Sequence, residues 1–111
     1  MKKVVWEGKM IKAPNIKGLE QLFEKNLSDE YLQKAISKVI SYEIAKTIEE
    51  SNELSAELKI YEQRLGMTSE DFFRKFNAGE LGDSADFFEW SALYQMYLRA
   101  SERLNILKTN D

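Results

Sequence analysis

The sequence predicts a mainly α-helical protein with about four helices, one of them long and amphipathic, after a short N-terminal extended segment or β-hairpin. Apolar residues recur at helical spacing through most of the chain, and one proline and five glycines in 111 residues leave long stretches without a helix breaker. The composition, 43% hydrophobic and 32% charged, provides material for one compact core in a chain too short for two domains. We therefore expect a single helical domain over residues 1–111.

The first element, residues 1–13, is predicted to be a basic extended arm or a hairpin. Two short apolar runs, 4–6 and 10–11, flank Gly8, which can take the positive φ that a tight turn needs. Two isolated strands of this length are marginal in water, so they must lie on the helices or add to a partner's sheet. Pro14 then interrupts the chain, and we expect a short helix at about 16–26.

The second element covers residues 28–65 and is either one long helix or a helix pair. Ser28 is expected to cap its start, and apolar residues repeat at helical spacing on both sides of the polar stretch 49–53. A continuous helix over 29–65 would be about 55 Å long, whereas a globule of this size has a radius of gyration of about 13 Å. Either the helix breaks near Ser51 and Asn52, or its apolar stripe continues against another chain. We favour a long helix used for association, which makes the protein a homodimer.

The third element, residues 68–108, is predicted to be an aromatic helical hairpin. Gly66 can end the long helix in a left-handed conformation, and Thr68 can cap a helix at about 69–78 that stops at Gly79. Asp83 or Ser84 then caps a last helix at about 85–108.

Composition also bears on chemistry. The chain has no cysteine and no histidine, so thiolate nucleophiles, imidazole acid–base catalysis and the usual zinc sites are excluded. Four carboxylates recur every third residue from 80 to 89, but helix capping explains them better than a metal site does, because they do not follow the EF-hand spacing. We therefore expect a protein that is not an enzyme and has no cofactor and no metal. No membrane-spanning or secretory segment is apparent, so a cytoplasmic location is expected.

Charge is unevenly distributed along the chain. Residues 1–17 carry a net charge of +4, whereas residues 18–111 carry −7. A basic head can bind nucleic acid, DNA in particular, or it can be an ordinary solubilising edge, which is the reading we favour. The candidate nucleic-acid residues are Lys2, Lys3, Lys9 and Lys12.

Eight of the thirteen aromatic residues lie between positions 72 and 97. Most of them should form the core, but neighbours on a helix diverge by about 100°, so Phe72 with Phe73, and Phe87 with Phe88, cannot all face one thin core. We expect one ring of each pair to face a partner protein, because exposed aromatic residues are over-represented at interface hot spots. Base stacking is disfavoured, since this part of the chain is acidic.

Residues 61–97 carry a motif that resembles a known family. Its parts are a Tyr-Glu pair, a Gly-Met followed by a Ser-Glu-x-Phe helix start, then Gly-Glu-Leu-Gly-Asp and Asp-x-Phe-Glu-Trp, matched here at 61–62, 66–72, 79–83 and 86–90. This motif is similar to that of small helical prokaryotic proteins regarded as the antitoxin-like half of toxin–antitoxin pairs.

The resemblance implies inhibition by binding. An aromatic and acidic surface would cover a small toxin, a nuclease, with charge guiding encounter and rings supplying affinity. The residues to which this role is assigned are Phe72, Phe73, Phe76, Glu80, Asp83, Asp86, Phe87, Phe88, Glu89, Trp90 and Tyr94.

Overall fold

The computed structural model describes residues 16–109, and in this range the chain is mainly helical, which confirms the predicted fold class. The described residues contain no strand, and the predicted arm or hairpin at 1–13 lies outside them. Four helices follow in order: α1 (Ile16–Glu24), α2 (Glu30–Leu65), α3 (Ser69–Asn77) and α4 (Ala85–Leu107).

The chain divides into two compact units, one ending at Lys38 and one beginning at Val39. In the first unit, α1 is amphipathic but contains no buried residue. It ends two residues before the predicted position, at Glu24, because Asn26 takes a left-handed conformation with φ 58°. The Leu27 N–H donates to the Leu22 carbonyl at 2.8 Å, which satisfies a carbonyl of the last turn. The prediction of a single domain concerns the relation between the two units and stays a prediction.

Asp29, and not the expected Ser28, caps the start of α2. The Leu32 N–H donates to Asp29 Oδ1 at 2.8 Å, whereas the hydroxyl of Ser28 accepts from the Gln33 side chain at 3.0 Å. Both residue types cap well, and the carboxylate also complements the positive end of the helix dipole.

The helix α2 is continuous over 36 residues, so the alternative of a break near Ser51 and Asn52 is wrong. Its length is about 54 Å at about 1.5 Å per residue. The polar stretch 49–53 contains neither glycine nor proline, and residues such as glutamate are good helix formers, so nothing local interrupts the helix.

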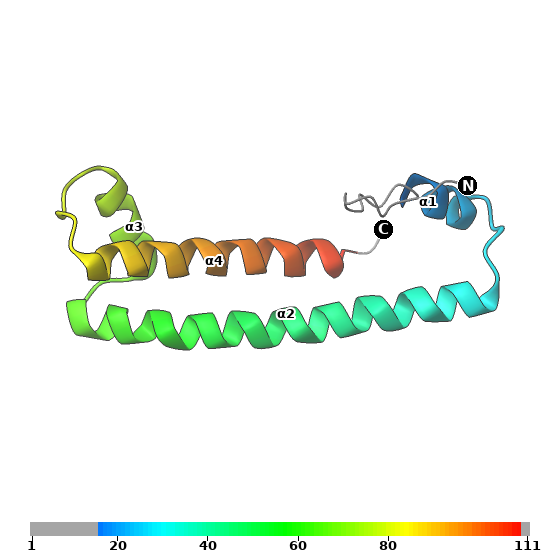
Figure 1. Ribbon diagram of the computed structural model, residues 1–111, viewed down its shortest axis with the longest axis horizontal. Helices are drawn as coiled ribbons and strands as arrows, with labels where there is room; N and C mark the ends of the chain where they lie inside the picture. Colours follow the sequence, from blue (N-terminus) through cyan, green and yellow to red (C-terminus); the bar gives the residue numbers. More distant parts are fainter. Residues whose placement is uncertain (1–15, 110–111) are drawn as a thin grey trace, which may run out of the picture. The chain divides into compact units, whose positions relative to one another are not determined.

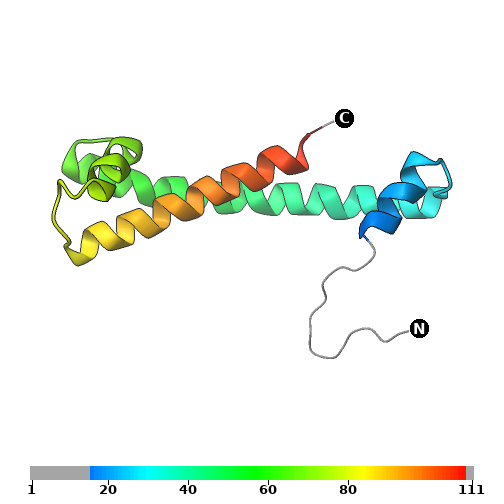
Figure 2. The ribbon, with the colours of Figure 1, turned by 90° about the horizontal axis from the view of Figure 1, so that it is seen from above.

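In the second unit, α4 runs antiparallel along α2, and α3 lies at the end where the two helices are joined (Figures 1 and 2). Arg103 fixes the register of the two long helices, because its guanidinium lies 3.1 Å from Glu43 and 3.7 Å from Glu50. These ion pairs are half-exposed and each contributes little to stability.

The register places α4 against Thr47, which lies between the two glutamates on α2. Thr47 is completely buried, and within the described residues its Oγ1 has no hydrogen-bond partner. A buried hydroxyl without a partner costs roughly 1–3 kcal/mol of desolvation.

We therefore expect Thr47→Val to raise the free energy of unfolding by about 1 kcal/mol, because valine keeps the branched shape and removes the unpaired hydroxyl. Thermal unfolding followed by circular dichroism measures this as a rise in Tm of roughly 4 °C. Thr47→Ala is the control: it also removes the hydroxyl but leaves a void, so it should lower Tm. A lower Tm for the valine variant would show that the hydroxyl has a partner in solution.

The predicted caps around α3 and α4 are confirmed. Gly66 and Gly79 have φ of 69° and 78°, in the left-handed region that glycine adopts without strain. The hydroxyl of Thr68 accepts from the Asp71 N–H at 3.0 Å, and that of Ser84 from the Phe87 N–H at 3.3 Å. The two helices end at Asn77 and Leu107, one residue earlier than expected in each case.

Candidate protein-binding site

The aromatic segment folds around Trp90, whose indole joins three helices. Its ring lies between Tyr61 of α2, with centroids 5.4 Å apart, and Phe72 of α3, with centroids 3.9 Å apart, and both pairs are nearly parallel. Trp90 and Phe72 are completely buried. Because aromatic rings bury large areas, this stack forms the centre of the core of the second unit.

A chain of hydrogen bonds runs beside the stack. The Trp90 Nε1–H donates to Ser69 Oγ at 2.8 Å, and the Ser69 hydroxyl donates to Glu62 Oε2 at 2.7 Å. The same carboxylate oxygen accepts from the Ser69 backbone N–H at 3.0 Å. Glu62 therefore caps the start of α3 from the end of α2, and the buried Trp90 N–H and Ser69 hydroxyl both have partners.

Sequence reasoning missed this network, although one signal was available. Glu62 lies in the last turn of α2, where the helix dipole disfavours a carboxylate. A carboxylate in that position needs a donor from elsewhere in the fold, and here the start of the next helix supplies it.

The two pairs of adjacent phenylalanines differ in their exposure. Phe72 is buried on Trp90, and its neighbour Phe73 is half-buried against Tyr94, with centroids 5.2 Å apart. Phe87 is half-buried against Phe72, but Phe88 is 57% exposed. Only the second pair therefore leaves a ring free for a partner.

Phe88 is held on one side by α3. Its ring meets the half-buried Phe76 edge-on, with centroids 5.3 Å apart. We call Phe76 and Phe88 the Phe88 surface. It is an apolar surface on a rigid support, because Phe76 in turn stacks on the buried Phe72 with centroids 5.3 Å apart.

The predicted acidic residues do not share one face with Phe88. Asp86 forms an ion pair with Arg64 of α2 at 3.3 Å, so it points toward α2. Glu89 also lies on the α2 side, because it acts on the phenol of Tyr61, a residue of α2. Burial raises the pKa of that phenol, and a hydrogen bond to Glu89 and the negative charge of Glu89 raise it further. At about 100° per residue, position 88 points away from both. The expected single surface of acids and rings is therefore divided by α4 itself.

The remaining predicted residues are found in three environments. Glu80 and Asp83 are exposed in the connection between α3 and α4, and Tyr94 is half-buried. Trp90 and Phe72, assigned to partner binding, are core residues in this fold, so we leave them out of the docking surface. The four predicted nucleic-acid residues, Lys2, Lys3, Lys9 and Lys12, lie outside the described residues, and their role stays a prediction.

Among residues 16–109, no three acidic side chains are grouped so that they could hold a metal ion. None of the described helices combines the length and the apolar character that a membrane crossing requires.

Comparison of the chain with the models of known protein families, with curated proteins and with solved structures gives no match.

Proposed function

We propose that this chain is a non-catalytic interaction protein that binds and covers a second protein. The partner fits the class implied by the sequence resemblance, a small toxin that is a nuclease, and a cytoplasmic location goes with this role. The observation that carries the proposal is Phe88, a large apolar ring that is 57% exposed on a rigid aromatic support. Aromatic rings are enriched at protein interfaces, where a few residues carry most of the binding energy.

Charge supports a basic partner. Residues 18–111 carry a net charge of −7, and Glu80 and Asp83 are exposed in the connection that leads into the helix of Phe88. A nuclease presents a positive surface to RNA, so an acidic protein is steered toward it, and association should slow as salt screens the charges.

The decisive variant is Phe88→Ala. Because the ring is exposed, we expect little change in Tm, whereas the complex with the product of the adjacent gene should weaken by about 30-fold or more, since hot-spot truncations cost about 2 kcal/mol or more. Co-expression followed by a pull-down and calorimetry measures both quantities.

Ile106→Ala is the matched control. Ile106 is 65% exposed and lies 18 residues after Phe88 on α4, which is five helical turns, so it points in the same direction at the other end of the helix. We expect it to leave the complex intact. Equal effects of the two variants, or none for Phe88→Ala, would remove the Phe88 surface from the proposal.

We also propose that two copies associate through α2, where Val39 and Tyr42 lie one turn apart and are largely exposed. Val39→Lys should then convert a dimer to a monomer in sedimentation experiments, because it places a charge in an apolar contact. Ile60→Lys, at another exposed apolar position of α2, is the control that should stay dimeric. A wild-type protein that sediments as a monomer would contradict the dimer.

A further inference from the structure

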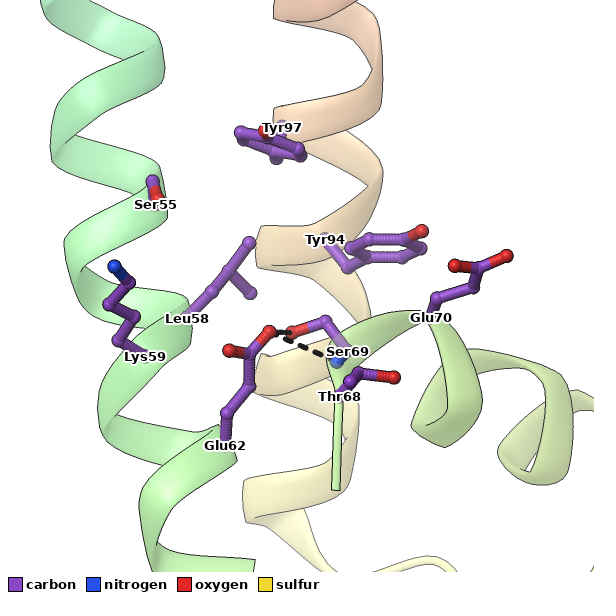
Figure 3. Close-up of a pocket in the computed structure, with 9 residues that line it drawn as sticks. All are labelled: Ser55, Leu58, Lys59, Glu62, Thr68, Ser69, Glu70, Tyr94 and Tyr97. Atoms are coloured by element: carbon purple, nitrogen blue, oxygen red, sulfur yellow. Dashed lines mark hydrogen bonds between the residues drawn. The ribbon is translucent and has the colours of Figure 1, made fainter. Parts of the chain in front are cut away.

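A cavity of about 210 Å³ opens between α2, the start of α3 and α4 (Figure 3). Pockets for drug-sized ligands occupy about 300–1,000 Å³, and one water takes about 30 Å³ of liquid, so this cavity fits one side-chain-sized group and not a nucleotide. The residues that line it are Ser55, Leu58, Lys59, Glu62, Thr68, Ser69, Glu70, Tyr94 and Tyr97.

The interior combines an aromatic wall with a carboxylate. Tyr94 and Tyr97 are nearly parallel, with ring centroids 6.5 Å apart. Glu62 uses Oε2 for both of its hydrogen bonds to Ser69, so within the described residues Oε1 keeps its full capacity as an acceptor. Figure 3 shows the Glu62 carboxylate beside Ser69, with Tyr94 and Glu70 neighbouring each other across the cavity.

The electrostatic field in the cavity is negative. Burial raises the pKa of the Tyr94 phenol, and the negative charges of Glu70 and Glu62 raise it further. Lys59 is the one cation among the lining residues, and no ion pair between residues 16–109 joins it to Glu62. A positive group is therefore favoured in the cavity over a neutral or negative one.

We propose that this cavity binds one guanidinium group, which an arginine of the partner protein presents. The inference rests on the proposed function and adds a second anchor to the Phe88 surface. A planar guanidinium can stack on a tyrosine ring and donate to Glu62 Oε1 at the same time. The ammonium of lysine is a compact and strongly hydrated charge, so it gains less from an aromatic wall.

The probe for the site is propylguanidinium, which has the end of an arginine side chain, titrated into the full chain at low salt and followed by NMR. We expect saturable shifts of the Tyr94 and Tyr97 ring signals, with a Kd of about 1–10 mM, as befits a single small cation. Propylurea, neutral and of similar shape, should produce no saturable shift.

Two charge variants locate the binding. Glu70→Gln should weaken binding of propylguanidinium by about threefold, because it removes one of the two carboxylates of the cavity. Glu57→Gln is the matched control, since Glu57 is an exposed carboxylate of α2 that does not line the cavity. Its Kd should equal that of the wild type.

The outcomes separate this inference from the proposed function. Equal shifts with propylurea, or equal Kd values for the two variants, would overturn the guanidinium site even where capture of a partner through Phe88 succeeds. Saturable binding of propylguanidinium without capture of any partner would refute the assignment of the group to a partner's arginine, and it would count against the proposed function separately. If a partner is captured, and Glu70→Gln weakens its binding whereas Glu57→Gln does not, the result would support both the guanidinium site and the proposed function.

Discussion

Replacing Trp90 by alanine should lower the free energy of unfolding by about 3–5 kcal/mol, a large part of the stability of a small domain. The indole is completely buried and stacks on Tyr61 and Phe72, so its loss opens a cavity that touches three helices. Its removal also takes away the donor to Ser69 Oγ. Urea unfolding followed by circular dichroism measures the effect as a fall in the midpoint.

Trp90→Phe separates packing from hydrogen bonding. Phenylalanine keeps most of the stack but cannot donate to Ser69 Oγ, so we expect a smaller loss, of about 1–3 kcal/mol. In a Ser69→Ala background the same substitution should cost less, because the hydrogen bond is already gone. Equal costs in the two backgrounds would show that the hydrogen bond contributes nothing to stability.

Much of the fold could be predicted from sequence because the ends of the helices carry local signals. The helix boundaries depend on local chemistry: Gly66 and Gly79 can take positive φ, and Thr68 and Ser84 present hydroxyls to the next turn. These signals act within a few residues, so no knowledge of the tertiary structure is needed to interpret them.

The candidate site was less predictable because it depends on contacts between helices. The sequence shows that adjacent rings on a helix must diverge, but it does not show how α3 packs on α4. In the structure, Phe72 contacts Trp90 and its neighbour Phe73 contacts Tyr94. The acidic residues were expected beside the exposed ring, and the ion pair of Asp86 with Arg64 shows that one of them faces α2. A contact across 22 residues has no local signal.

The same limit applies to the cavity that we assign to a guanidinium group. Glu62 and Tyr94 are 32 residues apart, and only the antiparallel pairing of α2 with α4 brings both to one wall. Leu58 contributes to that pairing from the buried stripe of α2, a stripe that the helical spacing did predict. The sequence therefore predicted the surfaces that form the core but not the polar groups that the core brings together.

Replacing Phe72 by alanine should have an effect of similar size but different extent. Phe72 is the one completely buried apolar side chain of α3, a helix of nine residues that is too short to be stable by itself. We expect a loss of about 3–5 kcal/mol, concentrated in the docking of α3, while the pairing of α2 with α4 survives.

Hydrogen exchange tests this expectation residue by residue. The amides of α3 should lose protection in Phe72→Ala, whereas those of α2 near Leu54 should stay protected, since Leu54 is buried on the part of α2 that faces α4.

Fluorescence in a Trp6→Phe background reports Trp90 alone among the two tryptophans, and its emission should shift to the red as the Phe72 ring is removed. Phe73→Ala is the control: its half-buried ring packs on Tyr94 and is not part of the stack on Trp90, so the emission should change little. Uniform loss of amide protection in all helices of the second unit would show that α3 does not unfold separately but belongs to one cooperative core. The Phe88 surface would then exist only while that whole core is folded.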